Sequence, residues 1–169
     1  MNTLFLIGRV VHILAAGLWL GSIFFLSMFL TPVLQTLGPD AGKVLVGLKQ
    51  RGLLAFMPSL AGFVILTGIY LYWHLTGFSG ANMNTTEAMV FGTGGILGLT
   101  ALIIGGAIVA RGLKRSVALI EQMAGKSDKE RAAMAGELLQ LRPRIATFSR
   151  VVLVLIAATT VLMELGHYV

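Results

Sequence analysis

Five polar side chains lie within or at the ends of strongly apolar stretches, and they are the residues of this chain best placed to do chemistry. They are Arg9, His12, His74, Glu164 and His167. A polar side chain inside a membrane span costs free energy unless it is paired, so such residues often serve a function. Imidazole binds haem iron, copper and zinc, and it exchanges protons near neutral pH.

Counting along the chain places these five residues at one level. At about 1.5 Å per helical residue, each histidine lies roughly 24–30 Å from the inner end of its own apolar segment. Arg9 and His12 are three residues apart. Glu164 and His167 have the same spacing, so each pair shares one helix face. We expect Arg9 and Glu164 to form a structural ion pair, because either charge alone would be costly in apolar surroundings.

Three interpretations of the histidines stay open. In the first they are ordinary interfacial residues beside an aromatic belt. In the second, two of them ligate a haem or a metal ion. In the third they relay protons, or bind a polar substrate or a quinone headgroup. The belt consists of Tyr70, Tyr72, Trp73 and Tyr168.

For the second interpretation the residues can be ranked as ligands. His12 comes first, because apolar residues follow it for about five helical turns. His167 is the expected partner, since Glu164 lies one turn away and can orient its imidazole. His74 is the third candidate, next to Trp73 at the water boundary. Haem b is the expected cofactor, and copper is the alternative.

Four apolar segments must position these residues, and they run roughly over residues 4–30, 53–75, 88–110 and 145–166. Each is long enough to cross a hydrocarbon layer of about 30 Å, which takes about 20 helical residues. The hydrophobic fraction of 56% and the mean hydropathy of +0.87 agree. We therefore predict an all-α integral membrane protein, a single domain over residues 1–169 built as a bundle of four transmembrane helices.

Basic residues are confined almost wholly to two places along the chain. Twelve of the thirteen lie between the first and second segments, or between the end of the third segment and the second turn of the fourth, where Arg150 lies. The positive-inside rule puts both of these links in the cytoplasm and both termini outside. The net charge of +6 is then explained without nucleic acid as a partner. We predict a multi-pass protein of the bacterial inner membrane, N-out and C-out.

The links carry helix signals of their own. Residues 84–87 (Asn-Thr-Thr-Glu) predict an N-cap for the third helix, and residues 127–130 (Ser-Asp-Lys-Glu) predict a capping box. The capping box begins a helix that Pro143 is expected to separate from the fourth span. The third helix is expected to continue over residues 111–123, which makes the third link a cytoplasmic helical hairpin. Pro58 is expected in the first turn of the second helix, where a missing N–H costs little.

Small residues at a spacing of four favour close helix packing in lipid. Gly17 and Gly21 form one such pair, and Gly94 and Gly98 form another. We expect both pairs to pack within the chain, and a dimer face is the alternative.

Three segments carry a family resemblance. Residues 9–21 combine a histidine, an apolar run and Trp-x-Gly, residues 56–71 run from Met-Pro to Thr-Gly-Ile, and residues 161–168 end in Gly-His-Tyr. These features resemble the small copper-resistance-D-like membrane proteins. The histidine with its Trp and the Met-Pro are also similar to the HemJ-type protoporphyrinogen oxidases. The resemblance covers three of the four spans.

The resemblance implies a four-helix bundle in which His12 is functionally important, with haem or copper beside it. The third segment lacks the lysine and histidine that HemJ-type enzymes carry there, so the resemblance implies the histidine site rather than the oxidase reaction. The expected function is a small membrane protein that binds haem b or a metal through His12 and His167 and serves membrane electron transfer. The alternatives are a non-catalytic accessory subunit or assembly factor of a larger membrane complex, a homodimer included, and a HemJ-like or copper-handling protein.

Overall fold

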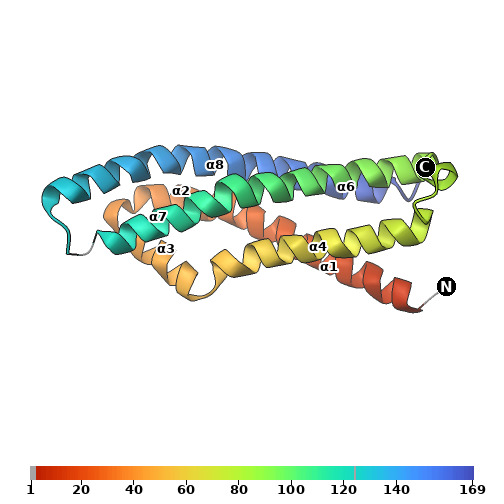
Figure 1. The fold of residues 1–169 in the computed structure, drawn as a ribbon, viewed down its shortest axis with the longest axis horizontal. Helices are drawn as coiled ribbons and strands as arrows, with labels where there is room; N and C mark the ends of the chain where they lie inside the picture. Colours follow the sequence, from red (N-terminus) through yellow and green to blue (C-terminus); the bar gives the residue numbers. More distant parts are fainter. Residues whose placement is uncertain (1–2, 124) are drawn as a thin grey trace.

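The computed structural model of the protein describes residues 3–123 and 125–169, and its helices are drawn in Figure 1. In the first half these are α1 (Thr3–Phe25), the π-helical turn η1 (Leu26–Leu30), α2 (Thr31–Thr36), the 3-10 turn η2 (Gly38–Asp40), α3 (Ala41–Gln50) and α4 (Leu53–Thr76). In the second half they are α5 (Gly80–Met83), α6 (Thr86–Ile104), the π-helical turn η3 (Gly105–Ala110), α7 (Arg111–Gln122) and α8 (Asp128–Leu165). The described residues form no strand, and the predicted all-α class is confirmed.

Four helical stretches are long and apolar enough to cross a membrane, as predicted. They are Thr3–Thr36, Leu53–Thr76, Thr86–Gln122 and Asp128–Leu165. Only 11–17% of the most apolar window of each stretch is buried inside the protein. Large apolar side chains such as Leu18, Leu66 and Val154 are instead at least 60% exposed. Such a surface suits contact with lipid and would favour aggregation in water.

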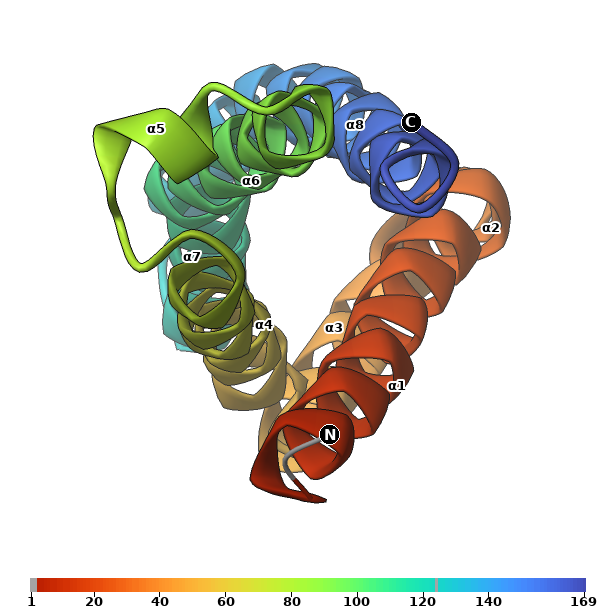
Figure 2. The same cartoon turned by 90° about the vertical axis from the view of Figure 1, so that its right-hand side faces the viewer.

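The four long helices lie side by side around a common axis, as Figure 2 shows. Contacts between neighbours run from α1 to α4, from α4 to α6, from α6 to α8 and from α8 back to α1. The buried core draws on all four stretches. It consists of Ala15, Trp19, Ala61, Val64, Ala101, Val152 and Ile156. Trp19 is its only aromatic side chain, and the alanines around it let the helices approach closely.

The two glycine pairs behave differently. A Cβ added at Gly94 would lie 3.0 Å from Cε of Met163 and 3.4 Å from Cβ of Leu162, so α6 packs tightly on α8 there, as predicted. A Cβ added at Gly17 or at Gly21 would meet no described atom within 4 Å. The prediction that Gly17 and Gly21 pack within the chain is therefore wrong, because these two glycines face away from α4 and α8.

Both predicted caps are present, but the first is made by Thr85, one residue after Asn84, which has the acid Glu87 three residues later. The side chain of Thr85 accepts from the backbone N–H of Ala88 at the start of α6, and Ser127 and Glu130 form the capping box of α8. Two proline predictions are wrong. Pro58 is the sixth residue of α4 rather than a first-turn residue. Pro143 lies inside α8, which runs unbroken for 38 residues.

The physical reason for the unbroken α8 lies in its surroundings. Pro143 has no N–H for the carbonyl of Leu139, four residues earlier, which is the usual cost of an interior proline. Leu139 is 67% exposed, so water or a polar headgroup can satisfy that carbonyl. The helical turns before and after Pro143 keep their own hydrogen bonds. The cytoplasmic helix and the fourth span, which were expected to be separate, therefore form a single helix.

The third link is helical and folds back along the bundle. Arg115 of α7 donates two hydrogen bonds to the carboxylate of Glu137 in α8, at 2.7 and 2.9 Å. Lys49 of α3 lies 2.8 Å from Glu121 of α7. The helical continuation over α7 is confirmed, while the cytoplasmic placement of this link stays a prediction.

Candidate functional site

The three histidines lie at the end of the bundle that holds both chain termini (Figure 1). His12 is in α1, His74 is in the last turn of α4, and His167 follows the end of α8. The three therefore share one end of the bundle, but His74 packs on Phe5, about two helical turns nearer that end than His12. Each imidazole nevertheless has its own set of contacts, and these decide what each can do.

His12 is half-buried and faces α4. Its Nδ1 lies 2.9 Å from Oγ1 of Thr67. The hydroxyl of Thr67 has one proton, which it donates to the backbone carbonyl of Phe63 or Val64, at 2.9 and 3.0 Å. When the hydroxyl donates to a carbonyl, its oxygen accepts from the N–H of Nδ1 of His12, and the backbone carbonyl of Val64 is a further hydrogen-bond partner of this imidazole. The other nitrogen, Nε2, then keeps a free lone pair.

Gly68 supplies the space for this imidazole. A Cβ built on Gly68 would lie 3.1 Å from Cε1 of His12 and 3.9 Å from its Nε2. A contact of that length is tighter than ordinary van der Waals distance, so α4 admits the ring because position 68 has no side chain. The roles of Thr67 and Gly68 towards His12 were not predicted from the sequence. Their only signal was the Thr-Gly pair in the family resemblance.

His167 is exposed and is held by Arg9. Nη2 of Arg9 donates to Nε2 of His167 across 3.0 Å. The imidazole also meets the ring of Phe91 edge-on, with centroids 5.0 Å apart. The nitrogen that would bind a metal is thus already used as an acceptor. In this arrangement His167 can serve as the second ligand through Nε2 only if Arg9 moves away.

The predicted ion pair between Arg9 and Glu164 is wrong, because Arg9 binds His167 instead. Glu164 accepts from the hydroxyl of Tyr168 at 3.3 Å. The reason lies in the end of α8. The helix stops at Leu165, and the following turn carries the imidazole rather than the carboxylate to Arg9. Gly166 allows that turn, since a Cβ there would be 2.7 Å from the ring of Phe91.

His74 lies among aromatic rings. Its centroid is 4.6 Å from that of Phe5 and 6.3 Å from that of Tyr70, with the latter pair stacked at 6°. The side chain is exposed. These contacts match those of an interfacial aromatic belt, and they favour the first interpretation for His74.

His12 combines a ring oriented by a hydrogen bond with an Nε2 that is available to a ligand, whereas His74 makes ring contacts only and Nε2 of His167 is bound by Arg9. Within residues 3–123 and 125–169, no three His, Cys, Asp or Glu side chains are grouped so that they could hold a metal ion. A bare ion would need several such ligands, whereas haem brings four nitrogens of its own and needs one or two from the protein. The donor set around His12 therefore fits haem with a single axial imidazole better than it fits a metal ion.

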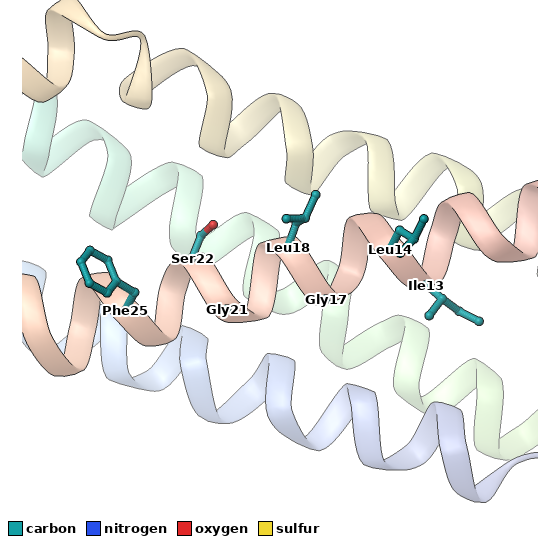
Figure 3. A pocket seen from close by; sticks show the side chains of 7 residues that line it. All are labelled: Ile13, Leu14, Gly17, Leu18, Gly21, Ser22 and Phe25. Carbon is teal, nitrogen blue, oxygen red and sulfur yellow. The ribbon is translucent and has the colours of Figure 1, made fainter.

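A second feature lies on α1, on the side away from the neighbouring helices. Figure 3 shows a shallow groove in which Gly17 and Gly21 leave the backbone bare between Leu14, Leu18 and Phe25. All the residues that line this groove belong to α1. It is the one place where a predicted packing motif is left without a neighbour in the described part of the chain.

We compared the chain with family models, with curated proteins and with solved structures, and none of them matches.

Proposed function

We propose that this protein is a small membrane protein that holds haem b through His12 and serves electron transfer. The observation that supports the proposal is the hydrogen bond between Nδ1 of His12 and Thr67. Ligating histidines typically donate their other ring N–H to an acceptor, which fixes the tautomer and the orientation of the ring. The pair Thr67 and Gly68 gives His12 both features, a fixed proton and room beside α4.

Two residues of the chain would act on a bound haem. His12 would bind the iron through Nε2, and Thr67 would hold the imidazole in place. A bound haem would supply a one-electron couple at its iron. Bis-histidine ligation by His12 and His167 would require Arg9 to leave Nε2 of His167, so the proposal uses His12 alone. Copper remains the second choice, since one imidazole is a sparse ligand set for an ion.

The visible spectrum of the purified full chain tests the proposal. We expect a Soret band that shifts on reduction. His12→Ala should abolish the band and leave the helical content unchanged. His74→Ala is the matched control, because it removes an imidazole from the same end of the bundle and should keep the band. A colourless wild-type protein, or a band that survives His12→Ala, would contradict the proposal.

The groove of Figure 3 favours a second candidate function, that of an accessory subunit in a larger membrane complex. A bare Gly-xxx-Gly face on α1 suits close approach of another transmembrane helix. Gly17→Leu would then break a complex that forms in gentle detergent, while Gly106→Leu, also at an open position, would not. A wild-type protein that carries no haem or metal and is sensitive to Gly17→Leu alone would favour this candidate over electron transfer.

A further inference from the structure

A basic pocket lies between α7 and α8. Figure 1 shows α7 in the half of the bundle away from the chain termini, and so away from the histidines. Its volume is about 220 Å³. Three arginines line it, Arg111 and Arg115 from α7 and Arg144 from α8. Guanidinium groups bind phosphate oxygens through two parallel N–H donors. The pocket therefore has the chemistry of a site for a phosphate group.

The charge of the pocket is only partly neutralised. Arg115 is held by the carboxylate of Glu137 through bonds of 2.7 and 2.9 Å. No ion pair of residues 3–123 and 125–169 involves Arg111 or Arg144. Two guanidinium groups thus face the same hollow with their charge uncompensated, beside a third whose position Glu137 fixes.

The other walls of the pocket are apolar, and their place along the bundle matters. Ala107 and Ile108 belong to the π-helical turn η3, one turn before Arg111 and towards the apolar part of the bundle. Arg111 is the first charged residue after Glu87, so it marks the end of the third apolar span. Opposite, Ile145 packs so closely on Gly112 that a Cβ there would lie 2.8 Å from it.

The lining of the pocket thus changes from charged to apolar side chains along the helix axis. A soluble anion would use the arginines alone. A phospholipid would use both parts, with its phosphate between Arg111 and Arg144 and the start of an acyl chain over Ala107 and Ile108. Basic pockets between transmembrane helices at the membrane surface bind anionic headgroups in this manner.

We propose that this pocket is a binding site for the phosphate headgroup of an anionic phospholipid. The site is independent of the haem proposal, because it lies at the other end of the bundle and shares no residue with it. The bound lipid would join α7 to α8 where these helices leave the apolar layer, and would stabilise their packing.

Lipid binding to the purified full chain tests the proposal. Native mass spectrometry follows the titration of the protein with phosphatidylglycerol and, separately, with phosphatidylcholine. Wild-type protein should retain phosphatidylglycerol in preference. The double variant Arg111→Gln/Arg144→Gln should weaken phosphatidylglycerol binding on the order of tenfold or more, since it removes the two guanidinium groups that have no carboxylate partner and would bond the phosphate directly. Arg115 is kept in this variant, so that its bond to Glu137 is not disturbed.

The matched control is Lys114→Gln/Arg142→Gln. It removes the same charge from the same two helices, at positions outside the pocket, and should leave phosphatidylglycerol binding within about twofold of wild type. Equal losses in both double variants would mean general attraction to the basic surface and would overturn the proposal. Binding of inorganic phosphate as strong as binding of the lipid would also overturn the proposal, because a soluble anion would then be the ligand.

The wild-type measurement does not depend on whether the variants fold. Equal retention of phosphatidylglycerol and phosphatidylcholine by the wild-type chain would by itself overturn the proposal.

Discussion

Arg9 and His167 lie 158 positions apart in the chain and are joined by a hydrogen bond of 3.0 Å between Nη2 and Nε2. The bond links the first long helix to the residues that follow the last one. It therefore closes the ring of helices at the end where the chain begins and ends. A guanidinium carries only donors, so the bond is charge-assisted and the imidazole must be the acceptor.

A double-mutant cycle on these two residues should show coupling. Arg9→Gln and His167→Ala should each lower the free energy of unfolding, and the double variant should lose less than the sum by about 0.5 kcal/mol or more. Chemical unfolding in detergent measures these losses. The cycle of Arg9→Gln with Glu164→Gln is the control, and its losses should add. Coupling in the control cycle alone would restore the pairing of Arg9 with Glu164.

The local features of this fold could be predicted from the sequence, but the contacts between helices could not. The caps at Thr85 and at Ser127 were predictable, because a cap needs only residues three positions apart. The choice of His167 over Glu164 as the partner of Arg9 depends on where α8 stops and turns, which helical periodicity does not encode. The same limit applies to Gly17 and Gly94. Each is followed by a second glycine four residues later, and only the arrangement of the neighbouring helices decides which of the two pairs packs against another helix.

The candidate site was predictable to a similar degree. His12 could be found because an imidazole in an apolar run is costly. Thr67 could not, because a threonine in a helix usually bonds its own backbone and shows no sign of a second partner. Thr67 does both here, and its second bond crosses from α4 to α1.

Thr67→Val should release His12. The variant keeps the shape of the side chain and removes the hydroxyl that bonds Nδ1, so the half-buried imidazole keeps only the backbone carbonyl of Val64 as a hydrogen-bond partner among the described residues. We expect the free energy of unfolding to fall by about 1–2 kcal/mol and any haem bound by His12 to be held less tightly. Thr100→Val is the matched control, because Thr100 bonds only the carbonyl of Ile96 in its own helix. Equal effects of the two substitutions would show that the bond to His12 contributes nothing.

Gly68→Ala tests the space beside the imidazole. The new methyl group would stand 3.1 Å from Cε1 of His12 and would push the ring away from Thr67. Gly62 lies in the same helix with no described atom within 4 Å of an added Cβ, so Gly62→Ala should be neutral or stabilising by up to about 1 kcal/mol. Thermal unfolding of both variants in detergent measures the difference. If Gly68→Ala is as stable as Gly62→Ala, the ring is not confined by α4.

Gly94→Ala tests the packing of α6 on α8. A Cβ at this position meets Met163 at 3.0 Å and Leu162 at 3.4 Å, and Met163 is flexible while Cβ of Leu162 is fixed to its helix. We expect a loss of about 1–3 kcal/mol from overpacking. Gly95→Ala is the control, because that neighbour points into open space. A loss for Gly95→Ala as large as that for Gly94→Ala would point to an effect on the helix itself rather than on the contact.

The orientation in the membrane can be read from single cysteines, since the chain contains none of its own. Ala81 lies in the short link between α4 and α6, and Lys129 lies at the start of α8; both are exposed. The basic residues near Lys129 predict that it is cytoplasmic, because otherwise twelve positive charges would have to cross the membrane. In intact cells an impermeant thiol reagent should therefore label Ala81→Cys at once and Lys129→Cys only after the membrane is opened. Labelling of Lys129→Cys in intact cells would invert the topology and place the histidines on the cytoplasmic side.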